Sequence, residues 1–467
     1  MVFSSHIFVF YFLPLCLALY YLLPNRTRNL FLTIASYCFY GWWKPWFVTL
    51  MMTSTLVDYI AGRVISAEGA TPGRRKLALI VSMCTNLGLL GVFKYAMFAQ
   101  DNLNTLLHMF GSDGFSMIRI TLPIGISFYT FQTMSYTIDV YRGKAEPVRR
   151  FVDFSCFVAL FPQLIAGPIV RYNTVAIQLA ERKHTLERFS SGVSLFILGF
   201  AKKILLANPI AIVADAAFAA DQPTALAAWF GATAFAFQIY FDFSGYSDMA
   251  VGLGRMLGFE FPKNFNSPYK SDSITDFWRR WHISLSTFLR DYLYFPLGGN
   301  QAGNRRTYIN LAIVMLVGGF WHGAYWQFIV WGAFHGSLLI AERLIGKKSF
   351  YARLPHLPRV LLTFVLVVIS WVPFRADTMG EALRILGAMF GILSPSPGAP
   401  LVYGVTFSPN GLVMMGISVL FITFKTQAWD FAEKLSWWKL PVIISLFLAS
   451  VGTMFSQSAN PFLYFQF

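Results

Sequence analysis

Two histidines, His282 and His322, are the side chains of this sequence best placed to do chemistry. His322 lies in the tripeptide Trp321-His322-Gly323, inside the run 307–341, whose 35 residues include no Asp, Glu, Lys or Arg. An ionisable group is costly to desolvate in so apolar a run, which favours a position facing a polar cavity or a reaction centre. A buried imidazole stays neutral, the form that can take a proton from a hydroxyl. His322 is therefore a candidate general base, with a helix–helix hydrogen bond as the structural alternative.

The other five histidines are weaker candidates for a chemical role. His335 lies thirteen residues after His322 and faces a different side of an ideal helix, so we expect it to hydrogen-bond between helices. The rest fall at segment ends or in loops, where we expect no chemical role: His6, His108, His184 and His356. No two histidines stand four residues apart, and the motifs H-E-x-x-H, C-x-x-C and G-x-S-x-G do not occur. The sequence therefore predicts no metal site and no simple hydrolase motif.

His282 belongs to the longest polar stretch, about residues 255–306. Ser273 is expected to cap a helix there, and Asp276 is placed to pair with the arginines three and four residues further on. Apolar residues then recur at spacings of three and four, which predicts one amphipathic helix at the cytoplasmic membrane interface. This apolar stripe consists of Trp278, Trp281, Leu285, Phe288 and Tyr292.

The composition indicates an integral membrane protein. The 467 residues are 56% hydrophobic and 13% charged, whereas soluble domains carry roughly 25% charged residues. Several charge-free stretches are long enough to cross about 30 Å of hydrocarbon. They are residues 1–25, 222–241, 307–341, 385–424 and 440–467. Together with shorter apolar segments, they predict an all-α fold of about ten to twelve transmembrane or re-entrant helices.

The net charge of +15 is explained by loops between these helices. Basic residues follow the first apolar segment and recur at 62–76 and 141–150, which predicts that residue 1 lies outside and these loops lie in the cytoplasm. Because the charges are not gathered on one soluble module, we expect no nucleic-acid partner. The cytoplasmic face should instead attract membrane lipid head groups and phosphorylated cofactors.

Several motifs together resemble one family. The run Phe-Trp-Arg-Arg-Trp-His-Ile-Ser-Leu-Ser at 277–286 and Gly-Phe-Trp-His-Gly at 319–323 resemble the bacterial alginate O-acetyltransferase branch of the membrane-bound O-acyltransferases. The further stretches that match this branch are 122–128, 164–168, 240–250, 290–294, 297–300 and 460–467. The resemblance thus covers essentially the whole chain.

The resemblance implies a ring of membrane helices around a central tunnel. His322 would be the catalytic histidine near its narrow middle, and His282 would line its cytoplasmic half. Acetyl-CoA would enter from the cytoplasm as acyl donor, with no permanently bound cofactor, and neutral His322 would deprotonate the acceptor hydroxyl. The candidate donors to the developing oxyanion are His282, Trp321 and backbone N–H groups near Gly318 and Gly319.

Further positions follow from the same resemblance. The candidate phosphate contacts are Arg279, Arg280, Lys263, Lys270, Arg305 and Arg306, each of which could equally hold the topology or bind lipid. The candidate tunnel-lining residues are Trp321, Asp242, Asp248 and Ser286, where a structural salt bridge or a helix cap is the alternative for the aspartates. We expect one integral-membrane domain over 1–467, with N-terminal helices at about 1–120, a catalytic core at about 121–345 and C-terminal helices at about 346–467.

The resemblance also implies a function. A multi-pass protein of the bacterial inner membrane would pass acetyl groups to a periplasmic acetyltransferase or acceptor protein within an exopolysaccharide synthesis and secretion complex. Alginate is the leading polymer, with cellulose or another polymer as alternatives. Two other classes of function stay open: a proton-coupled transporter with an intramembrane histidine relay, and a non-catalytic scaffold of an export complex. Transporters usually show an internal repeat, and none is found in this sequence.

Overall fold

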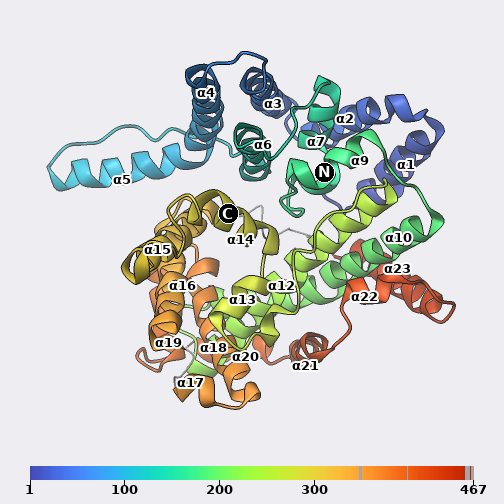
Figure 1. Cartoon of the computed structure of the whole chain (residues 1–467). Helices are drawn as coiled ribbons and strands as arrows, with labels where there is room; N and C mark the ends of the chain where they lie inside the picture. Colours follow the sequence, from blue (N-terminus) through green and yellow to red (C-terminus); the bar gives the residue numbers. More distant parts are fainter. Residues whose placement is uncertain (347–349, 397, 458–462, 464–467) are drawn as a thin grey trace. The chain divides into compact units, whose positions relative to one another are not determined.

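The computed structural model describes residues 1–346, 350–396, 398–457 and 463, and these ranges are built from helices with no β-strand among them (Figure 1). This confirms the predicted all-α class. The chain divides into two compact units, one of Met1–Val193 and Ala250–Pro262, the other of Ser194–Met249 and Lys263–Phe467. The predicted division near residues 120 and 345 stays a prediction. Most of the closing motif 460–467, and the end of the last predicted span, lie outside the described residues.

The first unit contains the N-terminal helices. Within α3, Asp58 is buried and accepts hydrogen bonds from Asn86 at 2.7 Å and from Thr137 at 3.2 Å, so its carboxylate is satisfied without a cation. The α-helices of this unit are α1 (Leu13–Leu22), α2 (Asn25–Gly41), α3 (Phe47–Ile65), α4 (Pro72–Leu90), α5 (Ala96–Met109), α6 (Ile126–Tyr141), α7 (Phe151–Ala159), α8 (Phe161–Leu164) and α9 (Tyr172–Ala180).

The second unit carries the polar stretch and the charge-free run singled out in the sequence. Two of the three boundaries between the units fall inside helices, α10 (Leu186–Ala201) and α12 (Ala225–Met256), and the third falls between Pro262 and Lys263. The other α-helices of the second unit are α11 (Asn208–Ala219), α13 (Ile274–Arg280), α14 (Ile283–Leu289), α15 (Gly303–His322), α16 (Trp326–Ile345), α17 (Phe350–Arg353), α18 (His356–Arg375), α19 (Met379–Met389), α20 (Ala399–Thr406), α21 (Pro409–Thr423), α22 (Ala428–Glu433) and α23 (Lys439–Ser456).

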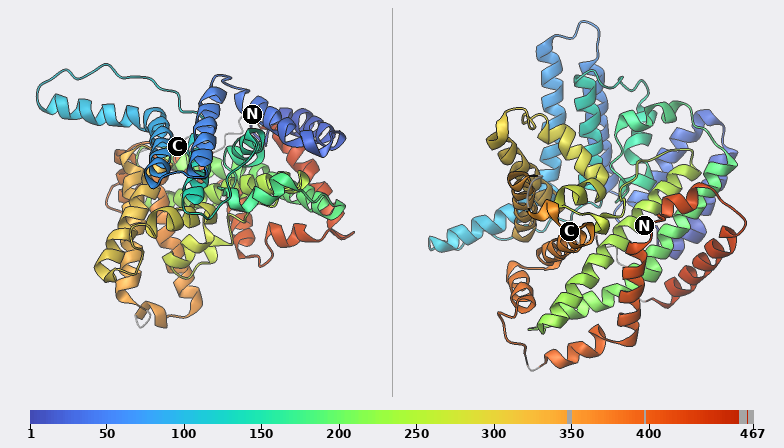
Figure 2. Two further views of the ribbon diagram at one scale, coloured as in Figure 1. Left: turned by 45° about the horizontal axis from the view of Figure 1, so that its top comes forward. Right: turned by 60° about the horizontal axis from the view of Figure 1, so that its bottom comes forward.

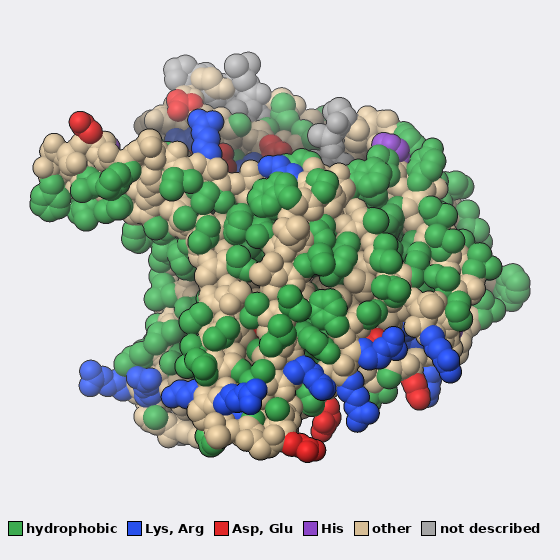
Figure 3. All heavy atoms as spheres, turned by 90° about the horizontal axis from the view of Figure 1, so that it is seen from above, with side chains coloured by type: hydrophobic (Ala, Val, Ile, Leu, Met, Phe, Trp, Pro, Cys, Tyr) green, Lys and Arg blue, Asp and Glu red, His purple; other side chains and the backbone are tan. Residues whose placement is uncertain are grey.

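The described residues include six helical stretches that are long and apolar enough to cross a membrane. They are Phe47–Ile65, Pro72–Met109, Leu186–Ala219, Trp326–Ile345, His356–Arg375 and Lys439–Ser456. Hydrophobic side chains also cover much of the surface that Figure 3 displays, as expected where lipid replaces water as the solvent. The predicted multi-pass membrane class is confirmed. The number of ten to twelve, which includes broken and re-entrant segments, stays a prediction.

The charge-free run is a helical hairpin rather than one helix. Helix α15 ends at His322, α16 begins at Trp326, and the two lie side by side (Figure 1, Figure 2). A methyl group on Gly319 would collide with the carbonyl oxygen of Phe328, and one on Gly332 with that of Met315. Small residues therefore let the two backbones touch.

The predicted single amphipathic helix of the polar stretch is wrong. Ser273 does cap its start, accepting a 3.1 Å hydrogen bond from the backbone N–H of Asp276. However, α13 ends at Arg280, because Trp281 is extended and His282 adopts a left-handed backbone conformation with φ of 44°. Left-handed backbone at a residue other than glycine is uncommon and concentrates at functional sites.

We predict that Gly332→Ala loosens the hairpin, whereas Gly336→Ala does not. At Gly332 the new methyl group meets backbone that cannot move aside, while at Gly336 its nearest neighbour is the Cβ of Met315 at 3.4 Å, an ordinary contact. Overpacking costs about 1–3 kcal/mol, so thermal unfolding in detergent should show a lower Tm for Gly332→Ala alone. Equal Tm values for the two variants would show that the close helix contact is not needed.

Candidate functional site

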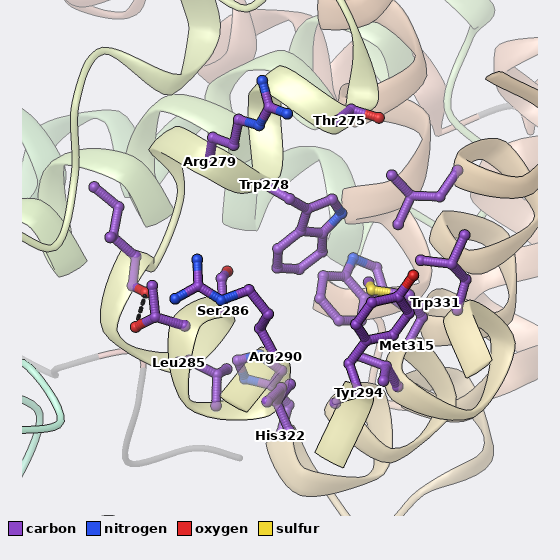
Figure 4. A pocket seen from close by; sticks show the side chains of 17 residues that line it. Thr275, Trp278, Arg279, Leu285, Ser286, Arg290, Tyr294, Met315, His322 and Trp331 are labelled. Atoms are coloured by element: carbon purple, nitrogen blue, oxygen red, sulfur yellow. Dashed lines mark hydrogen bonds between the residues drawn. The ribbon is translucent and has the colours of Figure 1, made fainter. Parts of the chain in front are cut away.

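His322, the last residue of α15, lines a cavity of about 530 Å³ within the second unit, which we call the His322 pocket (Figure 4). Its walls come from α13, α14, α15, α16 and the π-helical turn Arg290–Tyr294 that follows α14. Leucine, valine and methionine side chains make up much of the lining. The volume is that of a small-molecule site.

Polar groups enter the pocket at a few points. Ser286, predicted to line a tunnel, lies in its wall, and so do the side chains of Arg279 and Arg290. Arg290 pairs with Asp291 at 2.7 Å, which raises the pKa of the guanidinium. Arg279 is exposed and has no ion-pair partner within the described structure. Figure 4 shows Arg279 and His322 well separated across the pocket, so an elongated ligand could meet both.

His282 and His322, forty residues apart in the sequence, are neighbours in the structure. Their ring centres are 6.3 Å apart, and the ring of His282 also lies 6.1 Å from Trp321 and 4.8 Å from Phe243. His282 and Trp321 are buried, and neither lines the pocket. Burial lowers the pKa of His282 to about 3, so the ring is neutral at physiological pH.

The residue that holds His282 in place is Asn264, which the sequence analysis did not identify. Its backbone oxygen accepts from Ile283 N–H at 2.9 Å, and its side-chain oxygen accepts from the backbone N–H of Ser284 at 3.1 Å and from the Ser284 hydroxyl at 2.9 Å. These bonds satisfy the first amides of α14 and allow the chain to break at His282. An asparagine in a loop eighteen residues earlier carries no local signal of this role.

Asn264 also determines which nitrogen of His282 carries the proton. The His282 Nδ1 lies 3.3 Å from the same side-chain oxygen, which is fixed as an acceptor because the Ser284 backbone N–H donates to it. Nδ1 must therefore be the protonated nitrogen. In the neutral ring, Nε2 is then an acceptor, so His282 does not supply a donor to an oxyanion.

His335 has the structural role expected of it. Its Nδ1 accepts from the indole N–H of Trp278 at 3.3 Å, and its Nε2 lies 3.0 Å from the Ser370 hydroxyl. Since Nδ1 accepts, Nε2 carries the proton and donates to Ser370. Both nitrogens are used between helices, and the bond to Trp278 steadies one wall of the pocket.

The predicted phosphate contacts are not gathered in one place. All six are described, and Arg279 is the one in the pocket, while Arg280 pairs with Asp276 at 2.8 Å as the spacing predicted. Arg290, which lines the pocket, was not predicted. Its only sequence signal is its place in the motif 290–294.

The other four basic residues lie outside the pocket lining. Lys270 donates to the carbonyl groups at the end of α21, and Lys263 has its ammonium 5.3 Å from the centre of an indole ring. Arg305 and Arg306 are exposed at the start of α15. Helix capping and cation–π contact account for the two lysines without a bound phosphate.

The two aspartates form buried ion pairs and do not line the pocket. Asp242 lies 2.7 Å from Lys203, and Asp248 lies 2.6 Å from Lys202. Asp242 also accepts a 2.8 Å hydrogen bond from the backbone N–H of Leu463. These contacts match the structural alternative given for both residues, because a buried carboxylate requires compensation of this kind.

Comparisons with known proteins identify the family to which the part of the chain that forms this site is similar. Residues 149–362, which include the whole lining of the pocket, match the model of the membrane-bound O-acyltransferase family. The chain is 45% identical to the probable alginate O-acetylase AlgI of Pseudomonas putida, over 100% of both chains.

More distant relatives extend the comparison. The chain is 36% identical to the peptidoglycan O-acetyltransferase of Helicobacter pylori, covering 84% of this chain and 80% of the relative. It is 29% identical to the teichoic acid D-alanyltransferase of Streptococcus thermophilus, covering 54% and 68%. The chain is therefore a member of the membrane-bound O-acyltransferase family, and its chemistry is acyl transfer to oxygen.

Proposed function

We propose that the protein takes an acetyl group from cytoplasmic acetyl-CoA and passes it across the bacterial inner membrane for O-acetylation of an exopolysaccharide, with alginate the first candidate. The observation that carries the proposal is His322, a buried histidine in the wall of a pocket that also presents Arg279. Identity over the full length of a probable alginate O-acetylase supports both the acetyl group and the polymer.

Acyl transfer needs one general base and one site that stabilises the negative charge of the oxyanion. His322 takes the proton of the acceptor hydroxyl while the oxygen attacks the carbonyl carbon of the thioester. The new C–O bond forms as the carbonyl π electrons move to oxygen, giving an oxyanion. The carbonyl then re-forms, the C–S bond breaks, and the thiolate of CoA takes the proton from His322. The histidine ends neutral and ready for another cycle.

The apolar part of the pocket lining suits the acyl and pantetheine part of the donor. Leu285, Leu289 and Met315 line it, and they exclude water that would otherwise hydrolyse the thioester. Arg279 suits a phosphate of the donor, because a guanidinium without a carboxylate partner can bind an anion through two hydrogen bonds.

The acceptor class is proposed from the names of three relatives. An alginate O-acetylase, a peptidoglycan O-acetyltransferase and a teichoic acid D-alanyltransferase are all named for acyl transfer involving a polymer. A periplasmic acetyltransferase or acceptor protein within a secretion complex would receive the acetyl group here. Among these three relatives, the alginate protein shares the most identity with this chain, and this supports alginate as the first candidate, with cellulose and other polymers as alternatives.

We predict that His322→Ala lowers acetyl transfer by at least about 10²-fold, the range for loss of a general base. Purified protein with labelled acetyl-CoA and an acceptor would be assayed for consumption of the donor. His108→Ala, which removes an exposed histidine of α5, is the matched control and should keep full turnover. If His322→Ala kept its acetyl transfer and its Tm, His322 would not be the general base.

We also predict that Arg279→Ala raises the KM for acetyl-CoA about tenfold and leaves kcat nearly unchanged, since a charge-assisted hydrogen bond contributes about 1.5–3 kcal/mol. Arg343→Ala serves as the control, because Arg343 is exposed at the end of α16 and does not line the pocket. A KM unaffected by Arg279→Ala would mean that the phosphates bind elsewhere.

A further inference from the structure

The mechanism requires a hydrogen-bond donor for the oxyanion, and the structure excludes most of the donors expected from the sequence. The N–H groups of Gly318 and Gly319 lie inside α15, where they are used by the helix. His282 presents an acceptor, because its proton is held by Asn264. Trp321 is buried but does not line the pocket.

Trp331 lines the same pocket as His322 and carries a donor. The side chain is 1% exposed, and its indole N–H has no hydrogen-bond partner within the described structure. Its ring centre is 5.3 Å from that of His322. A buried hydrogen-bond donor without a partner costs about 1–3 kcal/mol of folding free energy. An unpaired donor beside a reaction centre therefore indicates that a ligand accepts its hydrogen bond.

The surroundings hold Trp331 rigidly. Its ring packs edge-on against Phe374 and Trp278, with ring centres 5.2 Å and 5.6 Å away, and stacks on Trp371 at 5.9 Å. Gly332, the next residue, is the point at which α16 touches α15. The ring is therefore fixed before any substrate arrives, which is the condition for electrostatic stabilisation without reorganisation.

We propose that the indole N–H of Trp331 donates a hydrogen bond to the carbonyl oxygen of the acyl group as that oxygen becomes negative. This inference rests on the proposed function and adds a catalytic residue to it. The indole keeps its proton throughout: His322 moves the proton of the acceptor hydroxyl, and Trp331 stabilises the charge that develops when the C–O bond forms. The ligand class is an acyl thioester bound with its carbonyl between His322 and Trp331.

The test compares kcat and KM in variants that remove only the N–H. Trp331→Phe keeps an aromatic ring, and replacement of Trp331 by 3-benzothienylalanine keeps the whole bicycle while sulfur takes the place of N–H. Both should lower kcat about 10²–10³-fold, the loss seen when one oxyanion donor is removed, with KM within about twofold. Trp229→Phe is the control, because it removes an indole N–H of the same unit that donates to the carbonyl oxygen of Met389 and does not line the pocket.

Three results would overturn the proposal. They are unchanged kcat in the benzothienyl variant, an effect on KM alone, or an equal loss of kcat in Trp229→Phe. Donor consumption by the wild-type protein, measured first, tests the proposed function separately: if His322→Ala abolishes turnover and the Trp331 variants do not, acyl transfer stands and the role of Trp331 fails.

Discussion

The site depends on the close contact between the backbones of α15 and α16 at Gly319 and Gly332. Neither position has room for a Cβ atom, so the helices touch and the residues beside the glycines are brought together. His322 is three residues after the first glycine, and Trp331 directly precedes the second. His322 and Trp331 thus line one pocket because the two helices lie close together.

Around this hairpin, hydrogen bonding decides which groups are available for chemistry. His335 uses both ring nitrogens between helices, and Asn264 holds the Nδ1 proton of His282. These hydrogen bonds lower the free-energy cost of burying the two polar rings. His322, in contrast, borders a cavity large enough for a substrate. The three histidines therefore differ in the hydrogen bonds of their ring nitrogens and in their access to the cavity, because their surroundings differ.

Local patterns in the sequence were sufficient to predict the membrane class and the cap at Ser273, and they singled out His322, which lines the pocket. These patterns failed where a contact joins residues that are far apart in the sequence. The helical period runs unbroken through His282, and only the hydrogen bonds of Asn264 reveal why the helix stops there. Trp331 resembles any apolar residue of a membrane helix until its N–H is found unpaired. Positive charge alone also does not distinguish Arg279, which lines the pocket, from Lys270, which caps a helix, or Lys263, which contacts an indole ring.

The most direct test of the account is a cryo-electron microscopy structure with a non-transferable analogue of acetyl-CoA. The account predicts that the carbonyl carbon lies in the His322 pocket, with its oxygen within hydrogen-bond distance of the Trp331 indole, about 3 Å. It also predicts the phosphates at the end of the pocket where Arg279 lies. An analogue bound elsewhere, with His322 and Trp331 sealed from it, would contradict the account.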